Sequence, residues 1–135
     1  MVKRIAHVGI ATRSVAEAAK FYKLLGLELN SLECNEEQKV NAALIRVGDS
    51  ALELLEATDF DSPVQRFIDR RGEGMHHITF EVDDIEEELS RLRAEKVSLI
   101  NESPVGGLEG TLVAFIHPRS TGGVLVELVQ SGEEG

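Results

Sequence analysis

The chain has 135 residues with a formal net charge of -10, and 42% of its residues are hydrophobic and 28% charged. This composition is typical of a globular protein, and the acidic charge argues against binding to nucleic acid or an anionic membrane, which requires a basic face. No apolar run reaches the roughly 18 residues that a membrane helix needs, and a single cysteine, Cys34, excludes an internal disulfide. We therefore expect one cytoplasmic domain over residues 1–135, with Cys34 as a small buried residue.

The first half of the chain predicts a strand, a helix and three further strands. Ser14 and Glu17 form a capping box that begins the helix, and Gly26 suits the left-handed position that follows a helix end. The expected bounds are a strand over 4–11, a helix from 14 to 25, and strands over 27–34, 39–47 and 51–57. A first βαβββ module thus spans 4–57, and a linker over 58–74 contains a short helix that begins at Ser62-Pro63.

The second half repeats this order over 75–130. Asp84 and Glu87 form another cap with an acid three residues on. The expected strands are 75–82, 97–101, 111–117 and 124–130, with a glycine-rich loop over 104–110 and a frayed tail over 131–135.

A shift of 70 positions aligns the first strand of the chain, 4–11, with the first strand of the second half, 75–82. It pairs His7 with His77, and the last strands of the two halves carry Glu53 and Glu127 between leucine-like neighbours. A carboxylate in an apolar strand costs several kcal/mol if it is buried without a partner. Each glutamate therefore either faces solvent or meets a cation, and the repetition favours the cation.

The first and fourth strands of each half can be neighbours in one curved sheet, which would place these four residues around a single cavity. Two imidazoles and two carboxylates suit a divalent first-row ion such as Co, Ni, Mn, Fe or Zn. His76 projects to the opposite face from His77 and is interpreted as a surface or inter-half residue. His117 matches no histidine of the first half and is at best a substrate contact.

Two basic clusters could meet an anionic ligand. They contain Arg66, Arg70 and Arg71, and Arg91, Arg93 and Lys96. The simpler interpretation, solvated faces of two helices, is favoured for both.

Five blocks of sequence, at 7–11, 53–56, 72–78, 81–85 and 117–128, resemble the vicinal oxygen chelate superfamily, and the resemblance covers 5–130. It implies an α+β fold of paired βαβββ modules that form a curved mixed sheet around a metal site. It also implies His7, Glu53, His77 and Glu127 as the metal ligands, the same four residues that the repeat indicates. Within the superfamily the blocks are most similar to epimerases of (2R)- and (2S)-methylmalonyl-CoA, which implies an acyl-CoA thioester substrate and a homodimer.

The implied chemistry is abstraction of the α-proton through an enolate, with Glu127 as the first candidate base. The chain departs from the family pattern in one stretch, which is Glu37-Gln38-Lys39-Val40 instead of the Glu-Gln-Gly-Val that is common in the family. Shortly after it, Ala42 stands where some relatives have a catalytic glutamate, so the second proton-transfer group must be found elsewhere. Two other functions compete with epimerisation. One is a glyoxalase I type isomerase or lyase, and the other is a metal-free binding protein of the antibiotic-sequestering kind.

Overall fold

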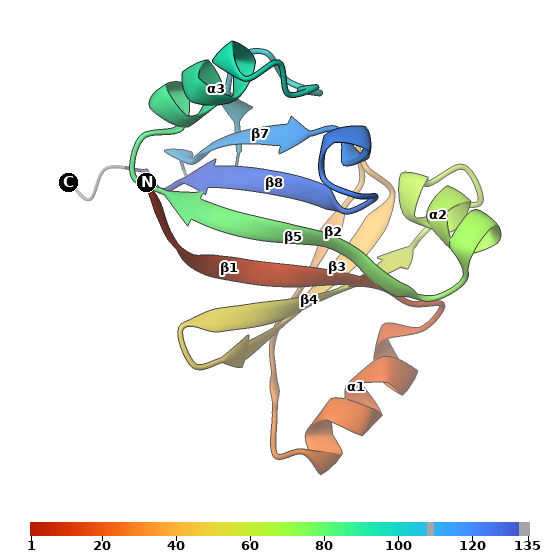
Figure 1. Ribbon diagram of the computed structural model, residues 1–135. Coiled ribbons are helices and arrows are strands. Elements are labelled where there is room, and N and C mark those ends of the chain that lie inside the picture. Colours follow the sequence, from red (N-terminus) through yellow and green to blue (C-terminus); the bar gives the residue numbers. More distant parts are fainter. Residues whose placement is uncertain (108–109, 133–135) are drawn as a thin grey trace. The chain divides into compact units, whose positions relative to one another are not determined.

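The computed structural model describes residues 1–107 and 110–132 (Figure 1). The chain divides into two compact units. One unit is His7–His76; the other is Met1–Ala6 together with His77–Gly135. The strand β1 (Val2–Ala11) therefore begins in one unit and ends in the other. A strand–helix–strand–strand–strand order occurs twice, and parallel and antiparallel pairings are mixed, which confirms the expected α+β class.

In the unit His7–His76 the strand order is β2-β3-β4-β1. Its elements after β1 are α1 (Val15–Leu24), β2 (Leu29–Asn35), β3 (Val40–Val47), β4 (Ser50–Ala57) and α2 (Pro63–Arg71). The β1–β4 pair is parallel, while β2–β3 and β3–β4 are antiparallel. The first and fourth strands of this module are thus neighbours, as expected.

Local signals account for the ends of α1 and for the turn that follows β2. The Ser14 side chain accepts a hydrogen bond from the Glu17 backbone N–H, and Gly26 adopts a φ of 85° just after the helix. Lys39 also has a positive φ, of 55°, at the turn between β2 and β3. A glycine adopts this conformation without steric cost, whereas residues with a side chain rarely adopt it.

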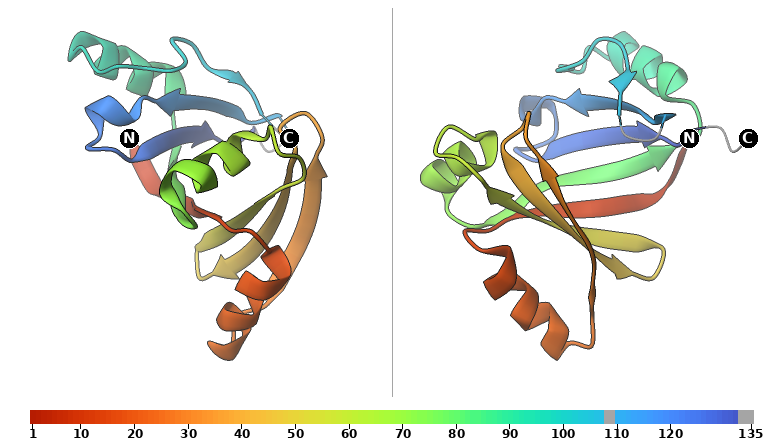
Figure 2. Two further views of the ribbon diagram at one scale, coloured as in Figure 1. Left: turned by 90° about the vertical axis from the view of Figure 1, so that its right-hand side faces the viewer. Right: turned by 180° about the vertical axis from the view of Figure 1, so that it is seen from behind.

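The helices α1 and α2 cover opposite faces of β4. Leu54 is buried with Val15 under α1, whereas Leu55 is buried with Val64 and Ile68 of α2. Adjacent strand residues point to opposite faces, so the two clusters lie on the two sides of the strand. Figure 2 shows the two helices, α1 in orange and α2 in green, from two further directions.

In the other unit the strand order is β5-β8-β7-β6, and β5–β8 is parallel. Its elements are β5 (Gly74–Val82), α3 (Ile85–Ala94), β6 (Val105–Gly106), β7 (Leu112–Ile116), the 3-10 helix η2 (Pro118–Ser120) and β8 (Leu125–Gln130). The Asp84 side chain caps α3 by accepting from the Glu87 backbone N–H. Ile85 and Leu89 of α3 are fully buried against β7 and β8.

Three expectations are corrected. The strand predicted over 97–101 is absent from the described residues apart from an isolated bridge between Leu99 and Ile116, and β6 lies instead at Val105–Gly106, inside the predicted loop. Cys34 is exposed rather than buried, because β2 pairs only with β3 in this unit and only Ser31 of its residues is even half-buried. Residues 108–109 of that loop and 133–135 of the predicted tail lie outside the described residues.

Within 1–107 and 110–132, no helix combines the length and the apolar character that a membrane crossing requires.

Candidate functional site

The first histidine–glutamate pair joins β1 to β4. The parallel register places Gly9 opposite Glu53, so His7, two residues earlier in β1, projects from the same face as Glu53. The His7 Nε2 atom lies 3.6 Å from Glu53 Oε1, and the two side chains are 21% and 25% exposed. Two residues 46 positions apart therefore meet because their strands are neighbours.

Partial burial changes the acidity of Glu53. Desolvation raises the pKa of its carboxyl group above the ordinary value, and the negative charge of Glu33 raises it further. The ionised carboxylate is therefore held in an environment that disfavours its charge. A cation beside it would relieve this penalty.

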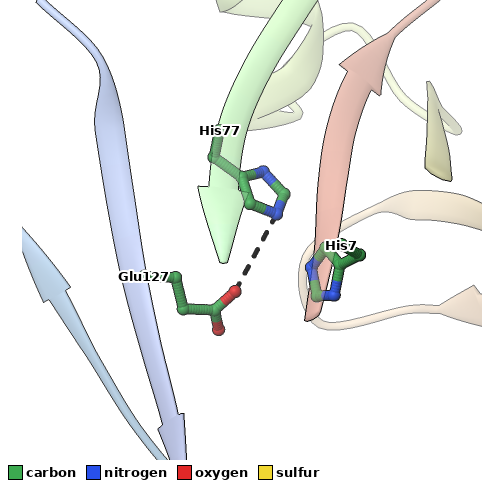
Figure 3. Close-up of side chains that lie close together, drawn as sticks. All are labelled: His7, His77 and Glu127. Carbon is green, nitrogen blue, oxygen red and sulfur yellow. Dashed lines mark ion pairs between the residues drawn. The ribbon is translucent and has the colours of Figure 1, made fainter. Parts of the chain in front are cut away.

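The second pair, in the other unit, joins β5 to β8. The side chain of His77 is only 8% exposed, and its Nε2 atom lies 3.8 Å from Glu127 Oε1. Figure 3 marks this contact with a dashed line and also draws His7 of β1. The structure thus brings the four predicted residues together as two pairs, one in each unit: His7 with Glu53, and His77 with Glu127.

Thr79 is a site residue that the sequence reasoning missed. It is 1% exposed, stands opposite Glu127 in the β5–β8 register, and its Oγ1 donates a 2.6 Å hydrogen bond to Glu127 Oε1. The repeat contains a sequence signal for Thr79, because the shift of 70 positions aligns it with Gly9, the register partner of Glu53. Glycine has no side chain that could bond a glutamate, whereas threonine has a hydroxyl. The two modules therefore match in their histidines and glutamates but differ in what holds the glutamate.

Both pairs lie on the strand face away from the first helix of their own module. Leu54, adjacent to Glu53, is buried under α1, and Leu128, adjacent to Glu127, is buried under α3. The two glutamates therefore point away from those helices. Neither carboxylate belongs to a fully solvated face, since their side chains are 25% and 14% exposed.

The other two histidines have different surroundings. His76 is half-buried, with its ring 4.8 Å from the Phe67 ring of α2, and burial lowers its pKa. Its interpretation as a surface or inter-half residue stays a prediction. His117 caps η2, where its Nδ1 accepts from the Arg119 backbone N–H at 3.0 Å. The predicted substrate contact of His117 stays a prediction.

The basic residues have partners of their own. Arg91 pairs with Glu87 and Glu88, and Arg71 lies over the Phe67 ring, 5.7 Å from its centre. The two clusters are thus partly occupied in contacts within their own helices.

Comparison with known proteins gives consistent matches over most of the chain. The model of the Glyoxalase/Bleomycin resistance protein/Dioxygenase superfamily matches residues 6–115. The Bacillus subtilis protein YqjC, described as uncharacterized, is 44% identical over 96% of this chain and 93% of its own length. Human mitochondrial methylmalonyl-CoA epimerase is 37% identical over 95% of this chain and 74% of its own length.

A solved structure agrees at the level of the fold. A variant of Streptomyces coelicolor methylmalonyl-CoA epimerase, in complex with 2-nitronate-propionyl-CoA, has a TM-score of 0.87 and 35% identity, and the match covers 100% of both chains. The resemblance to the vicinal oxygen chelate superfamily, and within it to methylmalonyl-CoA epimerases, is confirmed.

Proposed function

Since the chain belongs to the Glyoxalase/Bleomycin resistance protein/Dioxygenase superfamily, we propose that it is a metal-dependent enzyme that interconverts (2R)- and (2S)-methylmalonyl-CoA. The observation that carries the proposal is the presence of a histidine–glutamate pair in each module, in equivalent register and on equivalent faces. A protein that only sequesters a ligand has no need for this set. The metal-free binding protein is therefore disfavoured.

The donor set fits a divalent ion. His7, His77 and Glu127 each offer one ligand atom, and Glu53, whose ionised form is disfavoured by burial, offers a carboxylate that a cation would stabilise. Mixed imidazole and carboxylate donors suit Co, Ni, Mn, Fe and Zn. When bound, such an ion supplies positive charge that favours enolate formation from the thioester.

Within this proposal Glu127 accepts the α-proton. The hydrogen bond from Thr79 fixes the orientation of the carboxylate, and the burial of Thr79 keeps that hydroxyl from exchanging partners with water. The electron pair of the broken C–H bond moves onto the thioester oxygen, and a proton returned to the opposite face of the same carbon gives the other epimer. No oxidant or reductant takes part.

The substrate class comes from the relatives. The names of the human protein and of the Streptomyces coelicolor structure specify methylmalonyl-CoA and an acyl-CoA analogue, and both proteins match nearly the whole chain. A glyoxalase I type isomerase would use a similar ligand set on a different substrate, and no feature of the described residues favours it over the epimerase. The homodimer and the cytoplasmic location stay predictions.

Proton exchange tests the proposed reaction. The purified protein, loaded in turn with Co, Ni, Mn, Fe or Zn, is incubated with methylmalonyl-CoA in deuterated water, and the α-proton signal is followed by NMR. We expect the signal to disappear faster than with a metal-stripped control. An unchanged signal with every metal would exclude the epimerase, and the same assay with the hemithioacetal of methylglyoxal and glutathione tests the glyoxalase alternative.

Metal content tests the ligand set. His77→Ala removes a proposed ligand, whereas His76→Ala removes the adjacent imidazole, which packs on Phe67. We expect elemental analysis to show lowered metal in His77→Ala alone. Equal metal in both variants would contradict the assignment of His77.

A further inference from the structure

The two sides of Glu127 present different chemistry. On β5, Thr79 stands opposite Glu127, and His77 stands two residues before Thr79 on the same face. On β7, the antiparallel register places Phe115 directly opposite Glu127, with Val113 two residues away on the same face. All of these residues belong to one compact unit. Within it, the Glu127 carboxylate has a polar neighbour strand on one side and an apolar one on the other.

Phe115 is the largest apolar side chain that β7 and β8 present on the face of Glu127. The residues before and after it in β7, Ala114 and Ile116, are buried with Leu89 of α3. Adjacent strand residues point to opposite faces, so the Phe115 ring faces away from α3, as Glu127 does. The ring is half-buried there.

The backbone holds this ring close to Glu127. The Phe115 N–H donates a 2.8 Å hydrogen bond to Asn101 Oδ1, and its carbonyl oxygen accepts from the Ile100 backbone N–H at 2.9 Å. Both polar groups of Phe115 thus point away from β8, which makes Phe115 and Glu127 a non-hydrogen-bonded pair of the ladder. The Cα atoms of such a pair are about 4.5 Å apart, and the side chains lie closer than in a hydrogen-bonded pair. The ring therefore stands beside the carboxylate that the proposed reaction uses as its base.

The groups on the substrate's α-carbon match these two sides. The α-carbon of methylmalonyl-CoA carries a hydrogen, a methyl group, a carboxylate and a thioester carbonyl. When the hydrogen points at Glu127, the two oxygen-bearing groups belong on the polar side, near the His77 imidazole, whose Nε2 lies 3.8 Å from Glu127 Oε1. The methyl group gains from contact with apolar carbon. It therefore falls on the β7 side, against Phe115.

From this placement we infer that Phe115 determines the size of the α-substituent that the proposed epimerase accepts. The ring contacts a methyl group and closes the space that a longer alkyl chain would need. Hydrogen bonds on the edge of β7 away from β8 keep the ring from retreating with its strand. The inference rests on the proposed function and narrows its substrate class to acyl-CoA thioesters with a short α-substituent.

Kinetics with two substrates that differ by one methylene test this inference. The parent protein is assayed with methylmalonyl-CoA and with ethylmalonyl-CoA, and we expect kcat/KM to favour methylmalonyl-CoA by about 10- to 200-fold. Phe115→Ala removes the ring and should lower this ratio by about 10-fold or more. Phe115→Leu keeps a smaller apolar side chain, which protects the fold, and should lower the ratio by less.

Phe80 offers a matched control in the same unit. It is also half-buried, but it lies on β5 and packs against the core under α3, on the opposite face of the sheet. Phe80→Ala therefore removes the same ring from packing alone and should leave the ratio of the two kcat/KM values at its parental value. Elemental analysis should show parental metal content in all of these variants, because neither phenylalanine is a proposed ligand.

Binding provides a readout that needs no turnover. Propionyl-CoA and butyryl-CoA keep the thioester and differ by the same methylene, and isothermal titration calorimetry gives the Kd of each. Phe115→Ala should shift the ratio of the two Kd values in favour of butyryl-CoA, whereas Phe80→Ala should not.

The outcomes separate this inference from the proposed function. If the parent protein epimerises neither substrate, the proposed function fails and the assignment of Phe115 fails with it. The assignment alone is overturned if an active parent protein converts both substrates equally well, or if the Phe115 variants keep the parental ratios in both assays. It is also overturned if Phe80→Ala shifts the ratios as much as Phe115→Ala.

Discussion

Thr79→Val tests the hydrogen bond that Thr79 donates to Glu127, at the register position that Gly9 occupies opposite Glu53. Valine has nearly the shape of threonine but no hydroxyl, so the substitution removes the 2.6 Å hydrogen bond to Glu127 without opening a cavity at a residue that is 1% exposed. A hydrogen bond to a charged group contributes about 1.5–3 kcal/mol, and its loss leaves a partly buried carboxylate with fewer donors. We expect the free energy of unfolding of the metal-free protein to fall by that amount, which is about 10- to 150-fold in the folding equilibrium.

Urea unfolding, followed by circular dichroism, measures this loss. Thr79→Ser keeps the hydroxyl and loses only a methyl group, so it should be less destabilising than Thr79→Val if the hydrogen bond is the main contribution. A metal titration adds a second readout, because groups that orient a ligand typically contribute 10- to 100-fold to metal affinity. Thr79→Val with parental stability and parental metal affinity would refute the reasoning.

Three further predictions concern packing, ionisation and exposure. Leu89→Ala should lower the free energy of unfolding by about 2–5 kcal/mol because Leu89 is 0% exposed, whereas Phe60→Ala, at an 85% exposed residue, should stay close to the parent in the same urea titration. The pKa of Glu88 is lowered, chiefly by the hydrogen bond that it accepts from the Met1 amine. The ionised carboxylate of Glu88 therefore stabilises the fold at pH values above the ordinary carboxyl pKa. This stabilisation is lost as the pH falls through the lowered pKa. The difference in unfolding free energy between the parent and Glu88→Gln should therefore shrink from pH 7 toward pH 3, and a constant difference would contradict this. Cys34 is exposed, so a thiol reagent should modify the folded protein as fast as the urea-unfolded one at equal pH, and strong protection in the folded state would place Cys34 in an interface or core.

The sequence by itself determined the repeated module and singled out His7, Glu53, His77 and Glu127, whereas the two histidine–glutamate pairs come from the structure. Caps such as Ser14 and Asp84, and turn residues such as Gly26, act on neighbours within four positions, so their effect is visible in the sequence. The two-residue period of a strand also decides that Glu53 points away from Leu54. These local rules suffice for the element order in both halves but not for the position of β6, which was expected over 97–101 and lies at Val105–Gly106.

Only the tertiary structure decided which residues meet across strands and how deeply each is buried. The Thr79–Glu127 hydrogen bond and the His7–Glu53 pair depend on register between segments, which no local signal fixes. Cys34 was predicted to be buried from its residue type, but its exposure follows from the position of β2 beyond β3 in the strand order. Burial is a property of what packs against a residue, and here the packing partners come from parts of the chain that the local sequence does not specify.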